Sequence, residues 1–382
     1  MKACNRRSPV TMIVAGEASG DLHGSMLVRE MRALDPSLQF FGIGGNKMKE
    51  AGVDLIASAS EIGVVGATEV LTKAGTFLRV IRQVSKSLDA FRPDLVILID
   101  FPDFNLNIVA RAAKKRGVKV FYYISPQVWA WRQGRIEQIK RLVDKMAVIL
   151  PFEVEVYARR GFSVDYVGHP LVDTVKSTLS KSEARKLFGL KENKTTIGLL
   201  PGSRDSEISR LLPEMIRAAK LILKRRPDVQ YILPLADTLK EESVQRRMDA
   251  AVPVKIVPDR TYDVIACCDL AIVTSGTATL ETGLLGVPMV IIYKLSLLSA
   301  LIGRLFIRVD HIGLVNIIAG KTIVPELIQL DAKAEKIAEE ALAILTDEKR
   351  RTQMISDLSD LRSRMGEAGA ARRAAQIAYD MI

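Results

Sequence analysis

The chain has 382 residues, of which 48% are hydrophobic, and a formal net charge of +11. This length allows two domains of ordinary size, and the apolar content excludes a disordered chain. The positive charge favours anionic partners: nucleic acid, phosphorylated small molecules or acidic lipid headgroups. The three cysteines, Cys4, Cys267 and Cys268, form no CxxC pair, which argues against a zinc site and indicates a reducing compartment.

The N-terminus is basic and then apolar, which superficially resembles a signal peptide. Its apolar run covers only residues 10–15 and ends at Gly16 and Glu17, so it predicts a β-strand instead. No segment reaches the roughly 20 apolar residues of a membrane-spanning helix. The nearest candidate, residues 295–307, is short and contains Arg304, and it fits either a buried helix or an interfacial helix at a membrane surface.

Short apolar runs alternate with helical periodicity along most of the chain. Fully apolar runs flanked by helices are typical of parallel strands that are covered on both faces. They predict an α/β architecture with right-handed crossovers. The runs read VTMIVAG, LQFFGIG, DLVILID, VKVFYYI, KMAVIL, TTIGLLPG, VQYILPL, DLAIVTSG and PMVIIY.

Two halves are visible in this pattern, separated by a polar, lysine-rich connection. We expect a Rossmann-like domain over residues 1–173, a linker over 174–194 and a second Rossmann-like domain over 195–345. The carboxyl ends of both sets of strands should face a central cleft. Residues 346–382 are helical and rich in alanine and charge, and we expect them to pack back on the first domain or on a second subunit.

The first turn between strand and helix reads GEASGD and has the wrong spacing for the dinucleotide fingerprint of a dehydrogenase. Glu17 and Asp21 would repel a pyrophosphate, whereas carboxylates and the Ser19 hydroxyl suit a neutral polyol such as a sugar. Asp21 taken alone also fits a helix cap. We therefore expect an acceptor at Gly16, Glu17, Ser19, Gly20 and Asp21.

A second polar turn follows the buried strand that ends at Ile99, in the segment VILIDFPDFN. Asp100 lies at the carboxyl edge of this strand, where α/β active sites form, and it stands too early to cap the next helix. It is the candidate general base, although a single aspartate after a strand also fits a structural role. Asp103 or Asn105 can cap the helix that follows.

Both tryptophans of the chain, Trp129 and Trp131, lie in YYISPQVWAWRQGR, with Arg132 and Arg135 after them. This segment fits either a packed turn with a basic helix start or an aromatic wall for a sugar or an acyl chain. His169 precedes a proline near the domain boundary, where it fits a structural role as well as a catalytic one.

The second half opens with LLPGSR, in which a glycine turn joins a strand to a helix. Gly202 permits close approach of a ligand to the backbone, and Ser203 offers a hydroxyl. The Arg204 guanidinium matches phosphate oxygens, and the positive end of the helix dipole adds to its field. The segment therefore predicts a phosphate contact.

A comparable turn reads SGTATLE. Ser275, Gly276 and Thr277 offer backbone N–H and hydroxyl groups, and Glu281 can accept hydrogen bonds from ribose hydroxyls. Two phosphate-suited turns on neighbouring strands together predict a nucleoside diphosphate. Asn316 lies among apolar residues in LVNIIAGK and needs hydrogen-bond partners, which either the backbone or a ligand can supply.

Taken together, these motifs resemble the lipid-A-disaccharide synthase family, in the family's order and over nearly the whole chain. The wider resemblance is to glycosyltransferases of the GT-B fold. It implies an inverting transfer, without metal or cofactor, from UDP-2,3-diacylglucosamine to the 6-hydroxyl of 2,3-diacylglucosamine 1-phosphate. The products would be UDP and the β-1,6 disaccharide of lipid A, a component of lipopolysaccharide in the Gram-negative outer membrane. The motifs are GEASGD, IDFPDFN, YYISPQVWAWR, VGHPLVD, LLPGSR, SGTATLE and LVNIIAGK.

The resemblance also implies roles for residues and partners. Asp100 would be the general base, Arg204 would contact the diphosphate, and Glu281 would lie near the ribose. The remaining nucleotide contacts would be Gly202, Ser203, Ser275, Gly276, Thr277 and Asn316. The enzyme would be cytoplasmic and peripheral to the inner membrane. The apolar, basic segments 63–88 and 295–309 fit either lipid contacts or ordinary core helices. A homodimer that exchanges C-terminal segments is permitted by the helical tail, and nucleic acid is not an expected partner.

Two other functions compete with this one. A sugar-nucleotide epimerase of the same build would bind a UDP-sugar but would not need apolar, basic segments beside its cleft. A nucleic-acid-binding protein would use the positive charge, yet the chain has no recognition motif of that class. Turnover of a UDP-sugar without an acceptor would favour the epimerase over the transferase.

Overall fold

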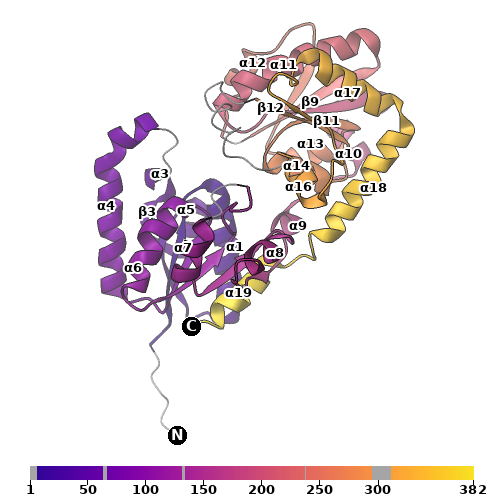
Figure 1. Ribbon diagram of the computed structural model, residues 1–382. Coiled ribbons are helices and arrows are strands. Elements are labelled where there is room, and N and C mark those ends of the chain that lie inside the picture. Colours follow the sequence, from indigo (N-terminus) through magenta and orange to yellow (C-terminus); the bar gives the residue numbers. More distant parts are fainter. Residues whose placement is uncertain (1–6, 63–66, 131–133, 237, 295–310) are drawn as a thin grey trace. The chain divides into compact units, whose positions relative to one another are not determined.

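The computed structural model describes residues 7–62, 67–130, 134–236, 238–294 and 311–382. Two α/β units make up the chain: Met1–Pro170 with Glu367–Ile382, and Leu171–Gly366 (Figure 1). Each unit is built on one parallel sheet flanked by helices, which confirms the predicted α/β class. The segment 295–309, the residues Trp131 and Arg132, and the start of the segment 63–88 lie outside the described residues.

The first unit has a seven-stranded sheet in the order β3-β2-β1-β4-β5-β6-β7, and all of its pairings are parallel. The strand order reverses between β1 and β4, and ligands of open α/β sheets bind beyond the strand ends at such a switch point. The strands are β1 (Val10–Ala15), β2 (Gln39–Gly44), β3 (Val53–Ser58), β4 (Leu95–Ile99), β5 (Lys119–Tyr123), β6 (Lys145–Val148) and β7 (Asp165–Tyr166).

The central strands of this sheet are buried along their whole length, as the continuous apolar runs predicted. Every residue of β1 and β4 is buried, because helices cover both of their faces. The helices are α1 (Ala18–Leu34), α2 (Asn46–Glu50), α3 (Ala59–Ile62), α4 (Ala67–Phe91), α5 (Pro102–Phe104), the π-helix η1 (Asn105–Ala110), α6 (Arg111–Lys114), α7 (Arg135–Leu142), α8 (Glu153–Ala158) and the C-terminal α19 (Ala370–Tyr379).

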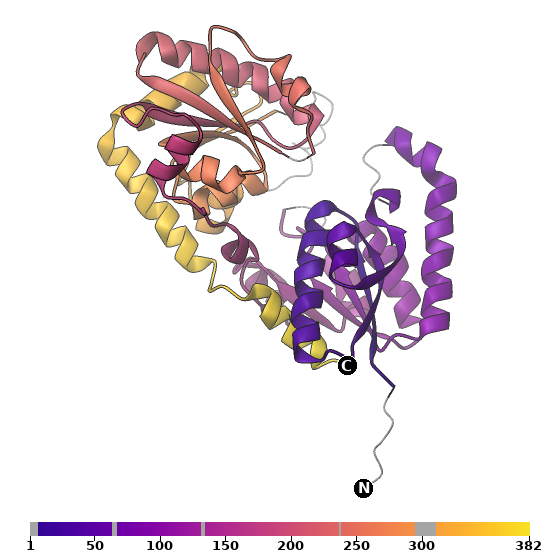
Figure 2. The same ribbon diagram turned by 180° about the vertical axis from the view of Figure 1, so that it is seen from behind.

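The C-terminal helix α19 returns to the first unit and packs along α1, as both views show (Figure 2). Its buried face is made of alanines, and small side chains let two helices approach closely. Two long-range hydrogen bonds fix it, from Lys119 Nζ to the Met381 carbonyl at 2.6 Å and from Arg373 Nε to the Val167 carbonyl at 2.9 Å. Of the tail expected over 346–382, this part joins the first unit.

The second unit has a six-stranded parallel sheet in the order β10-β9-β8-β11-β12-β13, with its switch point between β8 and β11. Its strand order around the switch point therefore repeats that of the first sheet. The strands are β8 (Thr195–Leu200), β9 (Val229–Leu235), β10 (Val254–Pro258), β11 (Leu270–Thr274), β12 (Met289–Tyr293) and β13 (Glu326–Ile328).

The helix α18 stays with the second unit, although it belongs to the expected tail. Its Leu358 and Leu361 lie within 3.5 Å of the position a Cβ would take on Gly283 in α14, so the two helices pack closely. Among the described residues, no helix is long and apolar enough to cross a membrane. The helices are α9 (Leu171–Thr174), α10 (Lys181–Leu187), α11 (Asp205–Arg225), α12 (Glu241–Gln245), α13 (Thr261–Ala266), α14 (Thr277–Leu284), α16 (Leu314–Ala319), α17 (Ala334–Thr346) and α18 (Glu348–Arg364).

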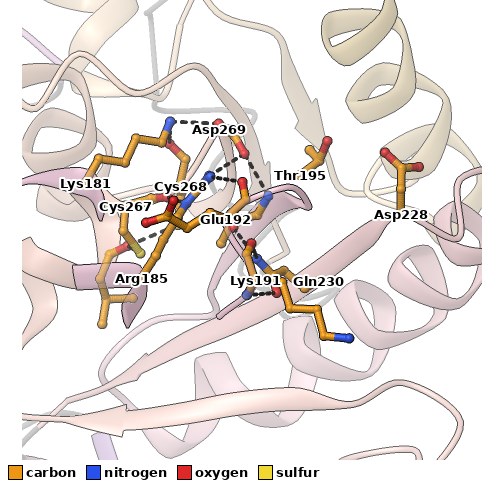
Figure 3. A network of polar contacts seen from close by, with 12 residues as sticks. Lys181, Arg185, Lys191, Glu192, Thr195, Asp228, Gln230, Cys267, Cys268 and Asp269 are labelled. Atoms are coloured by element: carbon orange, nitrogen blue, oxygen red, sulfur yellow. Dashed lines mark hydrogen bonds and ion pairs between the residues drawn. The ribbon is translucent and has the colours of Figure 1, made fainter. Parts of the chain in front are cut away.

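The connection expected to be a linker over 174–194 folds onto the second unit. Lys181 and Arg185 on α10 both reach Asp269, with nitrogen–oxygen distances of 2.7 and 2.6 Å (Figure 3). Arg185 is only 8% exposed and also donates to the carbonyl of Cys267. A buried arginine whose donors are satisfied in this way fixes α10 in place, so the polar composition reflects an ion-pair network instead of a free connection.

Candidate active site

The turn after β1 lies at the switch point of the first sheet and depends on glycine for space. A Cβ added to Gly16 would come within 2.3 Å of the Phe101 ring, and one added to Gly20 would lie 3.2 Å from the Ala15 side chain. These glycines let the N-terminus of α1 approach the strand ends. Glu17 is exposed at this turn, and so is Ser19.

Asp21 has a structural contact that the sequence did not reveal. Its carboxylate is 7% exposed and accepts hydrogen bonds from the backbone N–H groups of Gly45, Lys47 and Met48 at 2.7, 3.1 and 3.0 Å. These are the first N–H groups of α2, so Asp21 caps α2 and not its own helix. Both carboxylate oxygens are therefore engaged within the fold, and a contact of Asp21 with the acceptor stays a prediction.

Asp100 follows β4 at the same switch point. The pairing of Ala15 with Ile99 places it just beyond the end of β4, beside the turn that begins at Gly16. Burial, and next the nearby Glu17 carboxylate, raise the pKa of Asp100 to about 6, while the backbone N–H of Phe101 opposes this shift. A carboxylate with this pKa is mostly ionised at pH 7 and is a better proton acceptor than an ordinary aspartate.

The backbone at Asp100 is strained. Asp100 and Phe101 have φ angles of 44° and 47°, in the left-handed region that side chains other than glycine rarely adopt. The Asp100 carbonyl accepts hydrogen bonds from Asn105 Nδ2 at 2.7 Å and from the Tyr122 hydroxyl at 2.6 Å. Asp103 or Asn105 was expected to cap the helix that follows; neither α5 nor η1 has a side-chain cap hydrogen bond, and Asn105 instead binds the strand end.

The tryptophan segment contributes a packed wall. Trp129 lies edge to face against Phe152, with ring centroids 5.3 Å apart, and this contact fits the packed-turn interpretation. Arg135, at the start of α7, has a side chain only 10% exposed and pairs with the carboxylate of Asp103. Neither contact involves Asp100 directly.

The two histidines of the first unit are neutral at physiological pH. Burial, and next the proximity of His23, lower the pKa of His169 to about 3. Burial, and next Lys47, lower the pKa of His23 to about 4. His169 is 6% exposed, which fits a structural histidine, because a proton donor working near pH 7 needs a much higher pKa.

A buried carboxyl group near this wall escaped sequence reasoning. Glu153 is 1% exposed and accepts a hydrogen bond from the Leu150 N–H at 3.0 Å, and burial raises its pKa to about 7. Ser125 and Tyr157 share a hydrogen bond of 2.7 Å beside it. The sequence offered no signal, because a glutamate in the first turn of a helix is usually exposed.

The turn after β8 is closed by a carboxylate of its own helix. Glu207 accepts hydrogen bonds from the N–H groups of Ser203 and Arg204 at 3.0 and 3.3 Å. Gly202 has a φ of 112°, and a Cβ there would come within 2.1 Å of Glu207. The Arg204 side chain is 68% exposed and 3.7 Å from Glu207, so its guanidinium is accessible to a ligand.

The turn after β11 lies beside it, since Val273 of β11 pairs with Leu200 of β8. Gly276 has a φ of 148° and open space where a Cβ would stand, and Thr277 is exposed. The Ser275 hydroxyl donates to the carbonyl of Ile312 at 2.9 Å, which ties the turn to the loop before α16. The sheet thus brings together the two phosphate-suited turns that the sequence predicted.

Glu281 lies one turn into α14 and is held by a tyrosine. The Tyr262 hydroxyl, from the start of α13, donates to Glu281 Oε1 at 3.3 Å. Burial raises the pKa of Glu281, and the hydrogen bond from Tyr262 opposes that shift. Glu281 as a residue is partly buried.

Asn316 is committed to the fold. It is 0% exposed; its Nδ2 donates to the Val324 carbonyl and to Glu326 at 2.8 Å each, and its Oδ1 accepts from the N–H groups of Ile323 and Val324. All of its hydrogen-bonding positions are filled within the fold, and its expected contact with nucleotide stays a prediction. Glu326, which sequence reasoning missed, also accepts from the N–H groups of Ile312 and Gly313.

Comparison with known proteins agrees with this geometry. A sequence model of the family described as lipid-A-disaccharide synthetase matches residues 11–381. The chain is 54% identical over 377 residues to a lipid-A-disaccharide synthase of Syntrophus aciditrophicus, covering 98% of both chains. It is 50% identical over 372 residues to the same enzyme of Geobacter sulfurreducens, covering 97% of both.

Among solved structures, the chain is similar to the glycotransferase of kitacinnamycin, with a TM-score of 0.63, 14% identity, and coverage of 98% of this chain and 100% of that one. This likeness shows the fold alone, which is that of GT-B glycosyltransferases. High identity over nearly the full length shows more than the fold: the chain belongs to the lipid-A-disaccharide synthase family and is a hexosyltransferase.

Proposed function

We propose that this protein transfers a 2,3-diacylglucosamine unit from its UDP derivative to the 6-hydroxyl of 2,3-diacylglucosamine 1-phosphate. The products are UDP and the β-1,6-linked disaccharide 1-phosphate that lipid A biosynthesis requires. Family membership supports this reaction, since the relatives at 54% and 50% identity are lipid-A-disaccharide synthases.

The first unit is assigned to the acceptor. The Asp100 carboxylate takes the proton of the acceptor's 6-hydroxyl as its oxygen bonds to the anomeric carbon of the donor. The bond from that carbon to the diphosphate breaks, and UDP leaves with the electron pair. Glu17 and Ser19 are exposed beside Asp100 and are assigned to hydrogen bonds with sugar hydroxyls.

The second unit is assigned to UDP. Arg204 contacts the diphosphate, and the N–H and hydroxyl groups of Ser203, Ser275 and Thr277 complete the anion site. Glu281 accepts hydrogen bonds from the ribose. Because Glu207 holds the N–H groups of the first turn, diphosphate binding would displace that carboxylate toward solvent.

The observation that carries the acceptor assignment is Asp100 itself. It lies beyond the end of β4 at the switch point, in a strained turn, with a pKa raised to about 6. Strain and a raised pKa at one carboxylate are typical of a catalytic group and are not needed for folding.

We also propose that the enzyme works at the cytoplasmic face of the inner membrane, as a peripheral protein. The net charge of +11 supports attraction to anionic lipid, and Leu78 on α4 is 52% exposed. The test is sedimentation with vesicles: binding to vesicles containing anionic lipid, weakened by salt, supports this assignment, and no binding contradicts it.

The decisive experiment is acceptor dependence. Purified protein is incubated with the UDP-diacylglucosamine donor, and UDP release is measured with and without diacylglucosamine 1-phosphate. We expect UDP release only with the acceptor, together with a disaccharide detected by mass spectrometry. Conversion of the donor in the absence of acceptor would contradict the transfer reaction.

A further inference from the structure

We propose that Asn105 and Tyr122 are positioning residues that hold the Asp100 carboxylate in its working orientation by gripping the Asp100 carbonyl oxygen. This inference rests on the proposed role of Asp100 as the general base. Neither side chain needs to touch a substrate, since both act through the backbone of the turn.

The grip consists of two donors on one acceptor. Asn105 Nδ2 lies 2.7 Å from the Asp100 carbonyl oxygen and 3.2 Å from that of Ile99. The Tyr122 hydroxyl lies 2.6 Å from the same Asp100 oxygen. Asn105 reaches it from the start of η1 and Tyr122 from β5, so two elements converge on a single carbonyl. A carbonyl oxygen with two lone pairs can accept both bonds.

The turn needs an external hold because its residues disfavour it. Asp100 and Phe101 are consecutive left-handed residues, and Ile124, which follows β5, also has a positive φ of 66°. Three of the six described non-glycine residues with positive φ therefore lie at the carboxyl ends of β4 and β5. Such conformations persist only where the surroundings impose them.

The side chains that impose it are rigid and buried. Asn105 and Tyr122 are both 0% exposed, and the Tyr122 phenol stays protonated because burial raises its pKa far above the physiological range. Tyr122 lies on a strand whose register with β4 is fixed, with Leu98 opposite it. The donors are thus placed before any substrate binds, as preorganisation requires.

The turn uses one end of the Asn105 amide. Its Nδ2 donates to the carbonyls of Asp100 and Ile99, while its Oδ1 is buried and has no hydrogen-bond partner within the described part of the chain.

Loss of either hydrogen bond to the Asp100 carbonyl should displace the Asp100 carboxylate from its working orientation. A displacement of about 1 Å at a catalytic group lowers turnover by roughly 100-fold. We therefore expect Asn105→Ala to lower kcat by about 10- to 100-fold, and Tyr122→Phe, which removes a single oxygen, by about 10-fold. The KM for the donor should change little, because UDP is assigned to the other unit.

The pH profile supplies a readout that a purely structural defect would not move. Asp100 must be deprotonated to act, so kcat/KM, which follows the pKa of the free enzyme, falls as pH drops below about 6. The titratable group that raises the pKa of Asp100 is Glu17, from the turn after β1; the pKa of Tyr122 on β5 is itself raised by Asp100. A relaxed turn exposes the Asp100 carboxyl to water, and less burial lowers its pKa, so the acid limb of kcat/KM should move to lower pH in both variants.

Matched controls separate the grip from general damage. Asn107→Ala makes the same change on the same π-helix, where Asn107 is exposed and contacts only Gln138 in the described structure. Tyr231→Phe removes another buried tyrosine hydroxyl that donates to a carbonyl, that of Ala219, in the second unit. Both should keep kcat and the acid limb of the wild type.

A double-mutant cycle tests whether Asn105 acts through Asp100. In an Asp100→Asn background, adding Asn105→Ala should change the residual turnover less than about twofold, since the base it positions is gone. A further loss as large as in the wild-type background would overturn the inference and indicate damage to the unit as a whole. The double-mutant cycle and the Tyr122→Phe variant both remain informative if Asn105→Ala lowers the thermal stability.

The role of Asp100 as base and the positioning role of Asn105 and Tyr122 can be tested separately. If Asp100→Asn keeps near-normal turnover, the base assignment itself is wrong. If Asp100→Asn is inactive while Asn105→Ala and Tyr122→Phe keep normal kcat and the wild-type acid limb, only the positioning role is wrong.

Discussion

At the switch point of the first sheet, the carboxylate of Glu17 lies close enough to Asp100 for its charge to raise the pKa of Asp100. At the switch point of the second sheet, the turn that carries Arg204 follows β8, and the turn that carries Ser275 and Thr277 follows the neighbouring strand β11. Both sheets have the same strand order around these points. The topology therefore supplies two equivalent places for a ligand, and the residues in the turns decide which ligand each takes.

The turn after β4 and the turn after β8 are also stabilised in different ways. The acidic turn is strained and its carbonyl is gripped by buried side chains from neighbouring elements. The turn after β8 uses a glycine for its positive φ, and its helix is capped by its own Glu207. A base must keep one orientation through the reaction, whereas a phosphate site has to open its N–H groups to an incoming anion.

The largest effect should come from removing the base at the acidic switch point. Asp100→Asn keeps the size of the side chain, and asparagine tolerates left-handed backbone, so the turn should survive. We expect turnover to fall by about 10²- to 10⁴-fold, the usual contribution of a general base. Initial rates of UDP release measure this, with calorimetry showing unchanged UDP affinity. Weaker UDP binding by Asp100→Asn would contradict the assignment of the acceptor to the first switch point and of UDP to the second.

A smaller effect should follow at the basic switch point. Arg204→Ala should weaken UDP binding by roughly 10- to 100-fold, because a charge-assisted hydrogen bond contributes about 1.5–3 kcal/mol. Titration calorimetry with UDP measures it. Arg225→Ala, at the exposed last turn of the same helix, is the matched control and should bind UDP normally. Equal UDP affinities of the wild type and Arg204→Ala would contradict the proposed contact of Arg204 with the diphosphate.

A third variant tests whether Asn316 contacts the nucleotide or only stabilises the fold of the second unit. Asn316→Ala should lower the free energy of unfolding of the second unit by about 2–4 kcal/mol, since it leaves the N–H groups of Ile323 and Val324 without their partner and removes one hydrogen bond to Glu326. Thermal unfolding measures this loss. Below the melting temperature, UDP affinity should stay close to that of the wild type. Weaker UDP binding with an unchanged melting temperature would instead support a direct contact between Asn316 and the nucleotide.

Several parts of this site could be predicted from local sequence. Apolar runs ending in glycine turns indicated parallel strands and placed Asp100, Arg204 and Ser275 at strand ends. Strand ends are local features, because burial on both faces leaves a continuous apolar signal. The contacts of Asp21 and Asn316 within the fold could not be predicted in this way, because their partners lie 24 to 27 and 7 to 10 residues away and only folding brings them together.

The sequence alone therefore determined the α/β class, the family and the residue types at each strand end, since these follow from periodicity and from motifs read in order. Tertiary structure decided which polar groups remain free. Asp21 and Asn316 are consumed by backbone N–H groups, Asn105 serves the turn instead of capping a helix, and burial together with Glu17 sets the pKa of Asp100. Hydrogen-bond satisfaction and desolvation depend on neighbours distant in the chain, so no reading of local sequence could supply them.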